Sequence, residues 1–136
     1  MTAGALAYLD SSALVKLVVE EPESGALQAE LGRWTRWVTS ALARVEVRRA
    51  VRRGHDEPAV RERAEAVLGA CALLAVDARV LGRAAALEPT RLRTLDAIHL
   101  ASALELGADL GAFVAYDSDL VAAARRQKLA AFSPGA

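Results

Sequence analysis

The chain has 136 residues, of which 54% are hydrophobic and 25% charged, and its 17 basic side chains balance 17 acidic ones. This composition excludes an intrinsically disordered chain, and zero net charge excludes a protein that binds nucleic acid or membrane surfaces mainly by electrostatics. It does not exclude an enzyme that handles nucleic acid through metal ions. The length fits one domain, residues 1–136.

A single cysteine, Cys71, excludes both an internal disulfide and a cysteine-rich zinc site. Because it stands in an apolar run, we expect it to be a small buried residue. The first ten residues lack the basic region of a signal peptide, and no apolar run reaches the roughly 18 residues of a membrane span. We therefore expect a soluble, cytoplasmic protein that has no membrane partner.

Short apolar runs, which predict strands, alternate with amphipathic stretches, which predict helices. In the first half of the chain we expect a strand at residues 6–9, helices at 13–19 and 24–33, a strand at 37–39, a helix at 41–53 capped by Ser40, and a helix at 59–70. In the second half we expect a strand at 73–76, a helix capped by Asp77 and ending at Leu87, and a helix from Thr94 or Asp96 to about Leu106. The chain then continues with a strand at 112–115, a helix from Asp117 to Lys128 and a last strand at 129–132. Strands that are apolar throughout and separated by helices indicate a parallel sheet covered on both faces. The fold class is therefore α/β, with a high helix content.

Acidic residues stand where such a sheet places its ligands, beyond the carboxyl ends of the strands. Asp10 follows the first strand and Asp117 follows the strand at 112–115, while Asp96 lies at the start of a helix and Glu46 lies inside the helix that follows the second strand. Each acid taken alone is explained by helix capping or by solvation at the surface. Four carboxylates that converge would repel one another, and a cation would offset that repulsion. Because oxygen donors suit Mg²⁺ or Mn²⁺ better than zinc, the set predicts a site that activates water and stabilises a phosphodiester.

Four blocks of sequence carry a resemblance to a known family. They are Tyr8–Lys16, Thr39–Glu46, Arg93–Ala101 and Phe113–Leu120, and in this order and spacing they resemble the PIN-domain family, specifically the VapC-type toxins of bacterial toxin–antitoxin pairs. The resemblance implies a three-layer α/β/α fold around a short central parallel sheet. It also implies a Mg²⁺-dependent endoribonuclease, usually a homodimer, that a VapB-like antitoxin holds inactive.

Carried over by position, the resemblance assigns the acidic metal site to Asp10, Glu46, Asp96 and Asp117. Ser12 would assist the first acid through its hydroxyl or through the surrounding hydrogen bonds. In the mechanism that the family implies, a water activated by the metal attacks the RNA phosphorus, and the metal stabilises the departing oxygen.

Two positions depart from the family pattern. Many relatives carry a threonine where this chain has Ala115, so one hydroxyl near the fourth acid is missing. Asp119 is an additional acid that either enlarges the metal site or simply sits in the first turn of the last helix, where the helix dipole favours it; we favour the second. Thr94 either orients Asp96 or starts its helix, and the two roles are compatible.

Other residues have both a structural and a functional interpretation. Arg44 and Arg48 belong to a basic stripe that either contacts RNA phosphates or forms a solvated helix face. For His99 we favour a packed, hydrogen-bonded side chain over a proton-transfer role. Trp34 and Trp37 are expected in the core or at a partner interface.

The sequence thus predicts a single-strand-selective endoribonuclease of the VapC type that uses Mg²⁺, or Mn²⁺ in its place. Two alternatives remain open. One is a PIN-like module that binds RNA or protein without catalysis, and the other is a PIN nuclease of RNA processing that has no antitoxin.

Overall fold

The computed structural model describes residues 4–136 and shows one parallel sheet with the strand order β3-β2-β1-β4-β5. The predicted domain begins at residue 1, so residues 1–3 of it lie outside the described residues. The strands span β1 (Leu6–Leu9), β2 (Arg36–Ser40), β3 (Cys71–Leu74), β4 (Leu110–Val114) and β5 (Ala131–Phe132). Every neighbouring pair is parallel, so all the carboxyl ends of the strands lie at one edge of the sheet.

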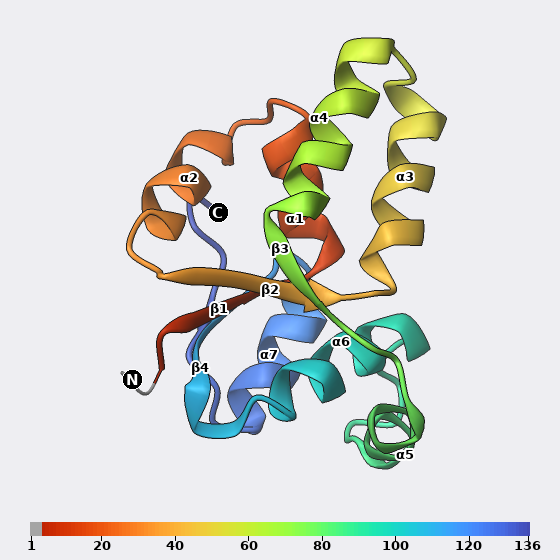
Figure 1. Ribbon diagram of the computed structural model, residues 1–136. Coiled ribbons are helices and arrows are strands. Elements are labelled where there is room, and N and C mark those ends of the chain that lie inside the picture. Colours follow the sequence, from red (N-terminus) through yellow and green to blue (C-terminus); the bar gives the residue numbers. More distant parts are fainter. Residues whose placement is uncertain (1–3) are drawn as a thin grey trace.

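Helices cover both faces of this sheet (Figure 1). One layer holds α1 (Ser11–Val18), α2 (Ser24–Leu31), α3 (Ala43–Gly54) and α4 (Pro58–Gly69); the other holds α5 (Ala78–Ala86), α6 (Thr94–Leu104) and α7 (Ser118–Arg126), with a short 3-10 turn, η1 (Gly107–Asp109), before β4. The three-layer α/β/α architecture and the parallel sheet that the sequence predicts are both confirmed.

The central strand β1 shows why the strands are apolar throughout. Alternate residues of a strand point to opposite faces, so Ala7 and Leu9 pack under α1–α4, whereas Tyr8 packs between β4 and the opposite helix layer. All three are fully buried. A strand with helices on both sides has no solvent face that would need a polar residue.

Element boundaries differ from the prediction by one or two residues at most positions, and β3 differs most clearly. The strand begins at Cys71 rather than at residue 73, because Cys71 to Leu74 pair in register with Trp37 to Ser40 of β2. As an edge strand, β3 is less covered than the others, and Leu73 stays 38% exposed. Cys71 is therefore only half-buried, which corrects the expectation that it is a buried core residue.

Helix starts near the strand ends also shift. Helix α1 begins at Ser11 rather than at residue 13, because the Asp10 side chain caps it. Ser40 ends β2 instead of capping α3, and its hydroxyl accepts a hydrogen bond from the Leu42 backbone.

Trp34 and Trp37 pack at the rim of the core, as half-buried residues. Within residues 4–136 we find no helix long and apolar enough to cross a membrane.

Candidate active site

Asp10 occupies the first position after β1 and is only 4% exposed. Its Oδ1 accepts hydrogen bonds from the Ala13 backbone N–H at 3.0 Å and from the Ser12 hydroxyl at 2.7 Å, which fixes the carboxyl group. Burial raises the pKa of Asp10 to about 6, although the bond from Ser12 opposes that rise. The chain thus holds a carboxyl group where its negative charge is poorly solvated.

Asp117 follows β4, the neighbour of β1, and so lies at the same edge of the sheet. Its Oδ1 caps α7 by accepting from the backbone N–H groups of Asp119 and Leu120 at 2.9 and 3.0 Å. Ser12 connects the two strand ends, because its hydroxyl donates to Asp10 and accepts from the Tyr116 backbone N–H at 3.1 Å. Ser12 therefore links the Asp10 carboxyl group to the backbone at Tyr116, the residue before Asp117.

Asp96 stands in the first turn of α6, with its side chain 19% exposed. Burial raises the pKa of Asp96, and the charges of Asp117 and Glu46 raise it further, while Arg93 and His99 oppose the rise. The charge of Asp96 in turn contributes to the raised pKa of Asp10. Asp96 therefore lies within electrostatic reach of all three other predicted acids.

Glu46 approaches from α3, in the layer opposite α6. Its Oε1 accepts a hydrogen bond from the Ser11 hydroxyl at 2.5 Å and lies 2.6 Å from Nε2 of His99. Burial alone would raise the pKa of Glu46, but the hydrogen bonds from His99 and Ser11 outweigh it and lower the pKa. Glu46 is thus an ionised carboxylate held by two donors.

These four side chains approach one another without forming a closed ligand set. Within residues 4–136, no group of three or more His, Cys, Asp or Glu side chains is arranged to hold a metal ion. Asp117 Oδ2 accepts a hydrogen bond from Nη2 of Arg93 at 3.0 Å, and Nε of Arg93 lies 3.6 Å from Oδ2 of Asp96. The donor chemistry nevertheless fits Mg²⁺ or Mn²⁺, because the donors are carboxylates whose repulsion a cation would relieve.

The lower-ranked candidates lie around this group. Thr94 is the exposed first residue of α6. Asp119 is exposed in the first turn of α7 and lines a hollow of about 90 Å³ together with Asp96 and Arg93. Ala115, where many relatives carry threonine, is fully buried.

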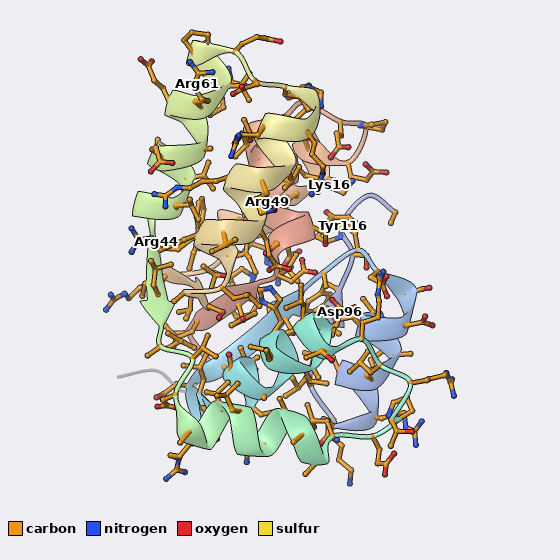
Figure 2. All side chains as sticks on the ribbon, turned by 90° about the vertical axis from the view of Figure 1, so that its right-hand side faces the viewer. Lys16, Arg44, Arg49, Arg61, Asp96 and Tyr116 are labelled. Atoms are coloured by element: carbon orange, nitrogen blue, oxygen red, sulfur yellow. The ribbon has the colours of Figure 1, made fainter. Side chains whose placement is uncertain are left out.

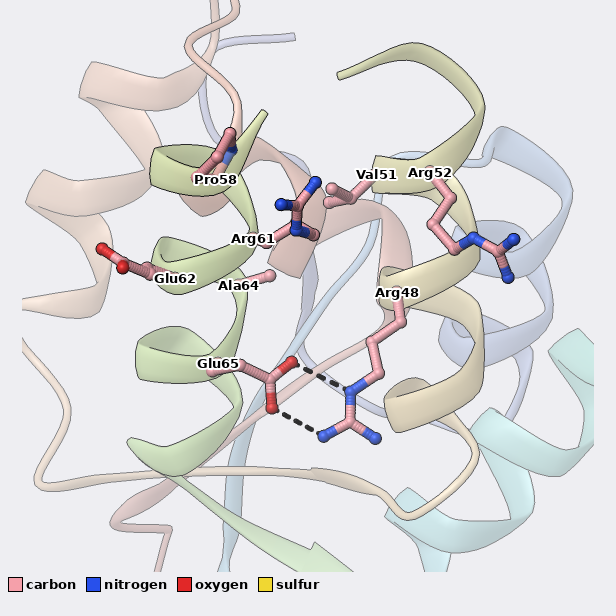
Figure 3. A pocket seen from close by; sticks show the side chains of 8 residues that line it. All are labelled: Arg48, Val51, Arg52, Pro58, Arg61, Glu62, Ala64 and Glu65. Atoms are coloured by element: carbon pink, nitrogen blue, oxygen red, sulfur yellow. Dashed lines mark hydrogen bonds and ion pairs between the residues drawn. The ribbon is translucent and has the colours of Figure 1, made fainter. Parts of the chain in front are cut away.

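The predicted RNA contacts Arg44 and Arg48 lie on a different side of α3 from Glu46. Arg48 makes a two-fold ion pair with Glu65 of α4, with Nε to Oε2 at 2.9 Å and Nη2 to Oε1 at 2.6 Å (Figure 3). These two residues border a pocket of about 450 Å³ between α3 and α4 that also has Val51, Pro58 and Ala64 in its wall. This pocket is larger than the hollow beside Asp96, but none of the four acids lines it, so we do not take it as the active site.

Arg49 shares a face of α3 with Glu46, three residues earlier, because residues at this spacing lie on one side of a helix. In Figure 2 the face that carries Arg49 also carries Lys16, Tyr116 and Asp96. Lys16 Nζ lies 4.7 Å from the centre of the Tyr116 ring.

Sequence reasoning missed the roles of Arg93 and Ser11. The contact of Arg93 with Asp96 could have been predicted, because a spacing of three residues brings two side chains together at a helix start. No sequence pattern indicates the contact of Ser11 with Glu46, because the two residues are 35 positions apart. His99 is 1% exposed and hydrogen-bonded, as predicted.

The fold agrees with comparisons to known proteins. The family model of the PIN domain matches residues 7–126. The ribonuclease VapC46 of Mycobacterium tuberculosis is 50% identical over 128 residues, which cover 93% of this chain and 96% of the relative. The ribonuclease VapC47 of the same species is 41% identical over 133 residues, covering 95% and 97%. The chain therefore belongs to the PIN-domain family, and within it to the VapC branch.

Solved structures support the same fold. The Mycobacterium tuberculosis toxin VapC20, described as cleaving the sarcin–ricin loop, has a TM-score of 0.70 at 18% identity and covers 86% of this chain and 94% of its own. VapBC2 of Rickettsia felis, bound to a promoter DNA fragment, gives a TM-score of 0.71 at 12% identity, with 93% and 97% covered.

Proposed function

We propose that this chain is a metal-dependent endoribonuclease, the toxin of a VapBC-like toxin–antitoxin pair, and that it hydrolyses phosphodiester bonds of single-stranded RNA. The proposal is supported by the placement of Asp10 and Asp117 at one edge of the sheet, where Arg93 bridges Asp117 and Asp96 and the charge of Glu46 reaches Asp96. The names of the relatives, which are ribonucleases matched over more than nine-tenths of the chain, support the same activity.

The site would hold Mg²⁺, with Mn²⁺ able to substitute, through Asp10, Glu46, Asp96 and Asp117. When bound, such an ion lowers the pKa of water and stabilises charge on a phosphoryl group. Ser12 keeps the Asp10 carboxyl group in place through its 2.7 Å hydrogen bond. The additional candidates Thr94 and Asp119 lie at the rim, where they would influence the outer hydrogen bonds.

Positive side chains next to the acids would bind the RNA backbone. Arg93 is 77% exposed and already faces two of the acids, so its guanidinium can turn to a phosphate that enters the site. Arg49 lies on the face of α3 that carries Glu46 and is exposed. Contacts with phosphates orient a strand without reading its bases, so these arginines would give affinity and leave sequence choice to other contacts.

The decisive experiment is cleavage of RNA by the isolated chain in Mg²⁺, in Mn²⁺ and in EDTA. Asp96→Asn removes a carboxylate charge of the proposed site and should abolish cleavage while the protein stays folded. Asp109→Asn, which changes an acid in η1 far from the group, is the matched control and should cut like the parent. Metal-dependent cutting that Asp96→Asn loses and Asp109→Asn keeps would support the proposal.

Two other results would point to different functions. No cleavage of any RNA, together with no metal binding in calorimetry, would favour the non-catalytic binding module. Cleavage by Asp96→Asn at the parent rate would place the active site elsewhere.

The partners proposed are a VapB-like antitoxin and a second copy of the chain. Light scattering after size-exclusion chromatography should give the mass of a homodimer, about twice the 14.4 kDa of one chain. Co-expression with a VapB-like antitoxin should yield a complex that does not cut RNA. A PIN nuclease without an antitoxin would instead purify alone and stay active.

A further inference from the structure

A buried line of hydrogen bonds connects Glu46 with the core of the protein. His99 lies between two partners: its Nε2 is 2.6 Å from Glu46 Oε1, and its Nδ1 is 2.7 Å from the Tyr8 hydroxyl. The three residues come from α3, α6 and β1, which are far apart in the sequence. Since His99 and Tyr8 are 1% and 0% exposed, the bond between them is shielded from water.

Tyr8, at the buried end of these hydrogen bonds, is held rigidly. The Tyr8 ring stacks on Phe113 of β4, with 5.5 Å between the ring centres and 7° between the planes, and meets His99 edge-on at 5.9 Å. This packing leaves the Tyr8 hydroxyl little freedom. The hydroxyl therefore fixes the plane of the imidazole, and the imidazole fixes the direction from which Glu46 receives its hydrogen bond.

The direction of each bond follows from the chemistry of the groups. An ionised carboxylate can only accept, so Nε2 of His99 carries the proton that faces Glu46. A nitrogen that lacks its proton can only accept, so in a neutral imidazole protonated at Nε2 the Tyr8 hydroxyl donates to Nδ1 of His99. When the imidazole is neutral, this arrangement places its proton at Nε2.

Both donors to Glu46 bind the same oxygen. Ser11 and His99 each contact Oε1, and within residues 4–136 no side chain or backbone donor contacts Oε2. The donors thus prevent rotation of the carboxylate, because turning it would break two bonds at once. Oε2 remains the oxygen that is available to a cation.

We propose that His99, oriented by Tyr8, is a positioning residue that holds Glu46 with Oε2 directed to the metal site. The inference rests on the proposed function and assigns a role to two buried residues that would otherwise belong only to the core. Hydrogen-bond partners of metal-binding side chains typically change metal affinity or activity by about 10- to 100-fold when mutated. A residue that only fills space would lack this effect when replaced by one of similar volume.

The test uses calorimetry of Mn²⁺ binding to the full chain, with two matched substitutions of His99. His99→Gln keeps an N–H donor that reaches Glu46, and His99→Met fills similar space without any donor. We expect His99→Met to weaken Mn²⁺ binding by about 10- to 100-fold and His99→Gln to recover most of the loss. If His99→Met folds and binds Mn²⁺ as tightly as the parent, the proposal is overturned.

Tyr8→Phe keeps the aromatic packing and removes only the hydroxyl, so it covers the case in which His99→Met does not fold. We expect weaker Mn²⁺ binding and a mixture of His99 tautomers in nitrogen-15 NMR spectra of the imidazole, whereas the parent should be protonated only at Nε2. A parent spectrum with the proton at Nδ1, or a Tyr8→Phe protein with unchanged spectrum and affinity, would overturn the inference.

The same measurements separate the two proposals. A parent that binds no Mn²⁺ and cuts no RNA would defeat the proposed function and the inference with it. A parent that binds Mn²⁺ and cuts RNA, alongside a folded His99→Met protein that does both equally well, would defeat the inference alone.

Discussion

Arg93 and Asp117 are joined by an ion pair, with Nη2 of the arginine 3.0 Å from Oδ2 of the aspartate. The same guanidinium lies 3.6 Å from Asp96, so one exposed arginine offsets the charge of two of the proposed metal ligands. A cation that enters the site competes with this arginine for the same oxygens.

Replacing Arg93 by glutamine should therefore strengthen metal binding. An exposed ion pair is weak, so the expected gain in Mn²⁺ affinity is about two- to fivefold. Calorimetry in low salt measures it, and Arg91→Gln, at an exposed arginine two residues away, is the control. Unchanged or weaker binding by Arg93→Gln would show that the arginine does not compete with the cation.

Asp10→Asn should make the metal-free protein more stable at pH 7.5. Asparagine keeps an oxygen for the Ala13 N–H and the Ser12 hydroxyl but removes a buried charge. Because the pKa of Asp10 rises from 3.8 to about 6, the charged form is disfavoured in the folded state, by about 3 kcal/mol as an upper bound.

The stability of the folded protein changes with pH in a definite direction. A carboxyl group whose pKa is higher in the folded chain binds its proton more tightly there, so the parent loses stability as the pH rises from about 4 to about 6. Urea denaturation in EDTA should show the advantage of Asp10→Asn at pH 7.5 and its disappearance near pH 4. A variant less stable than the parent at pH 7.5 would contradict the assignment of Asp10 as a strained, buried charge.

Two arginines of α3 should differ in their effect on RNA binding. Arg49 is three residues after Glu46 and shares its face, whereas Arg44 is two residues before Glu46 and lies about 200° around the helix. We expect Arg49→Ala to weaken binding of a single-stranded RNA and to lower the salt dependence of that binding, and Arg44→Ala to change both less. Fluorescence anisotropy at several salt concentrations compares them, and equal effects would count against binding of the RNA along the face of α3 that carries Glu46.

Cys71 should react slowly with alkylating agents in the native protein. Burial raises the pKa of its thiol from 9.0 to about 11, so the reactive thiolate at pH 8 is about 100-fold scarcer than in an exposed cysteine. Mass spectrometry should show an alkylation rate that increases about tenfold per pH unit up to pH 10. The urea-unfolded chain is the control, and a native rate equal to the unfolded rate would contradict the prediction.

The sequence was sufficient to predict the layers of the fold and the places of Asp10 and Asp117. Both acids end short apolar runs, and a parallel sheet brings such ends to one edge regardless of the details of packing. Strand limits were less predictable: the apolar run that contains β3 extends past Leu74, and only pairing with β2 determines where the strand stops.

The contacts between layers could not be predicted from the sequence. Glu46 and His99 are 53 residues apart and belong to helices on opposite faces of the sheet, so no local pattern relates them. The basic stripe was correctly predicted to lie on a helix, α3. The sequence did not show which way its arginine side chains point, because the packing of α4 against α3 determines that Arg48 pairs with Glu65.

The four acids are contributed by segments that begin at residue 10 and end only at residue 117. During synthesis, a chain still lacking α7 would have β1 and α3 complete but would have neither Asp117 nor the strand pairing that brings it to Asp10. A nascent chain therefore cannot assemble the four-acid site proposed above before Asp117 has been added and has emerged. The order of the segments along the chain ties completion of the proposed site to the pairing of β1 with β4.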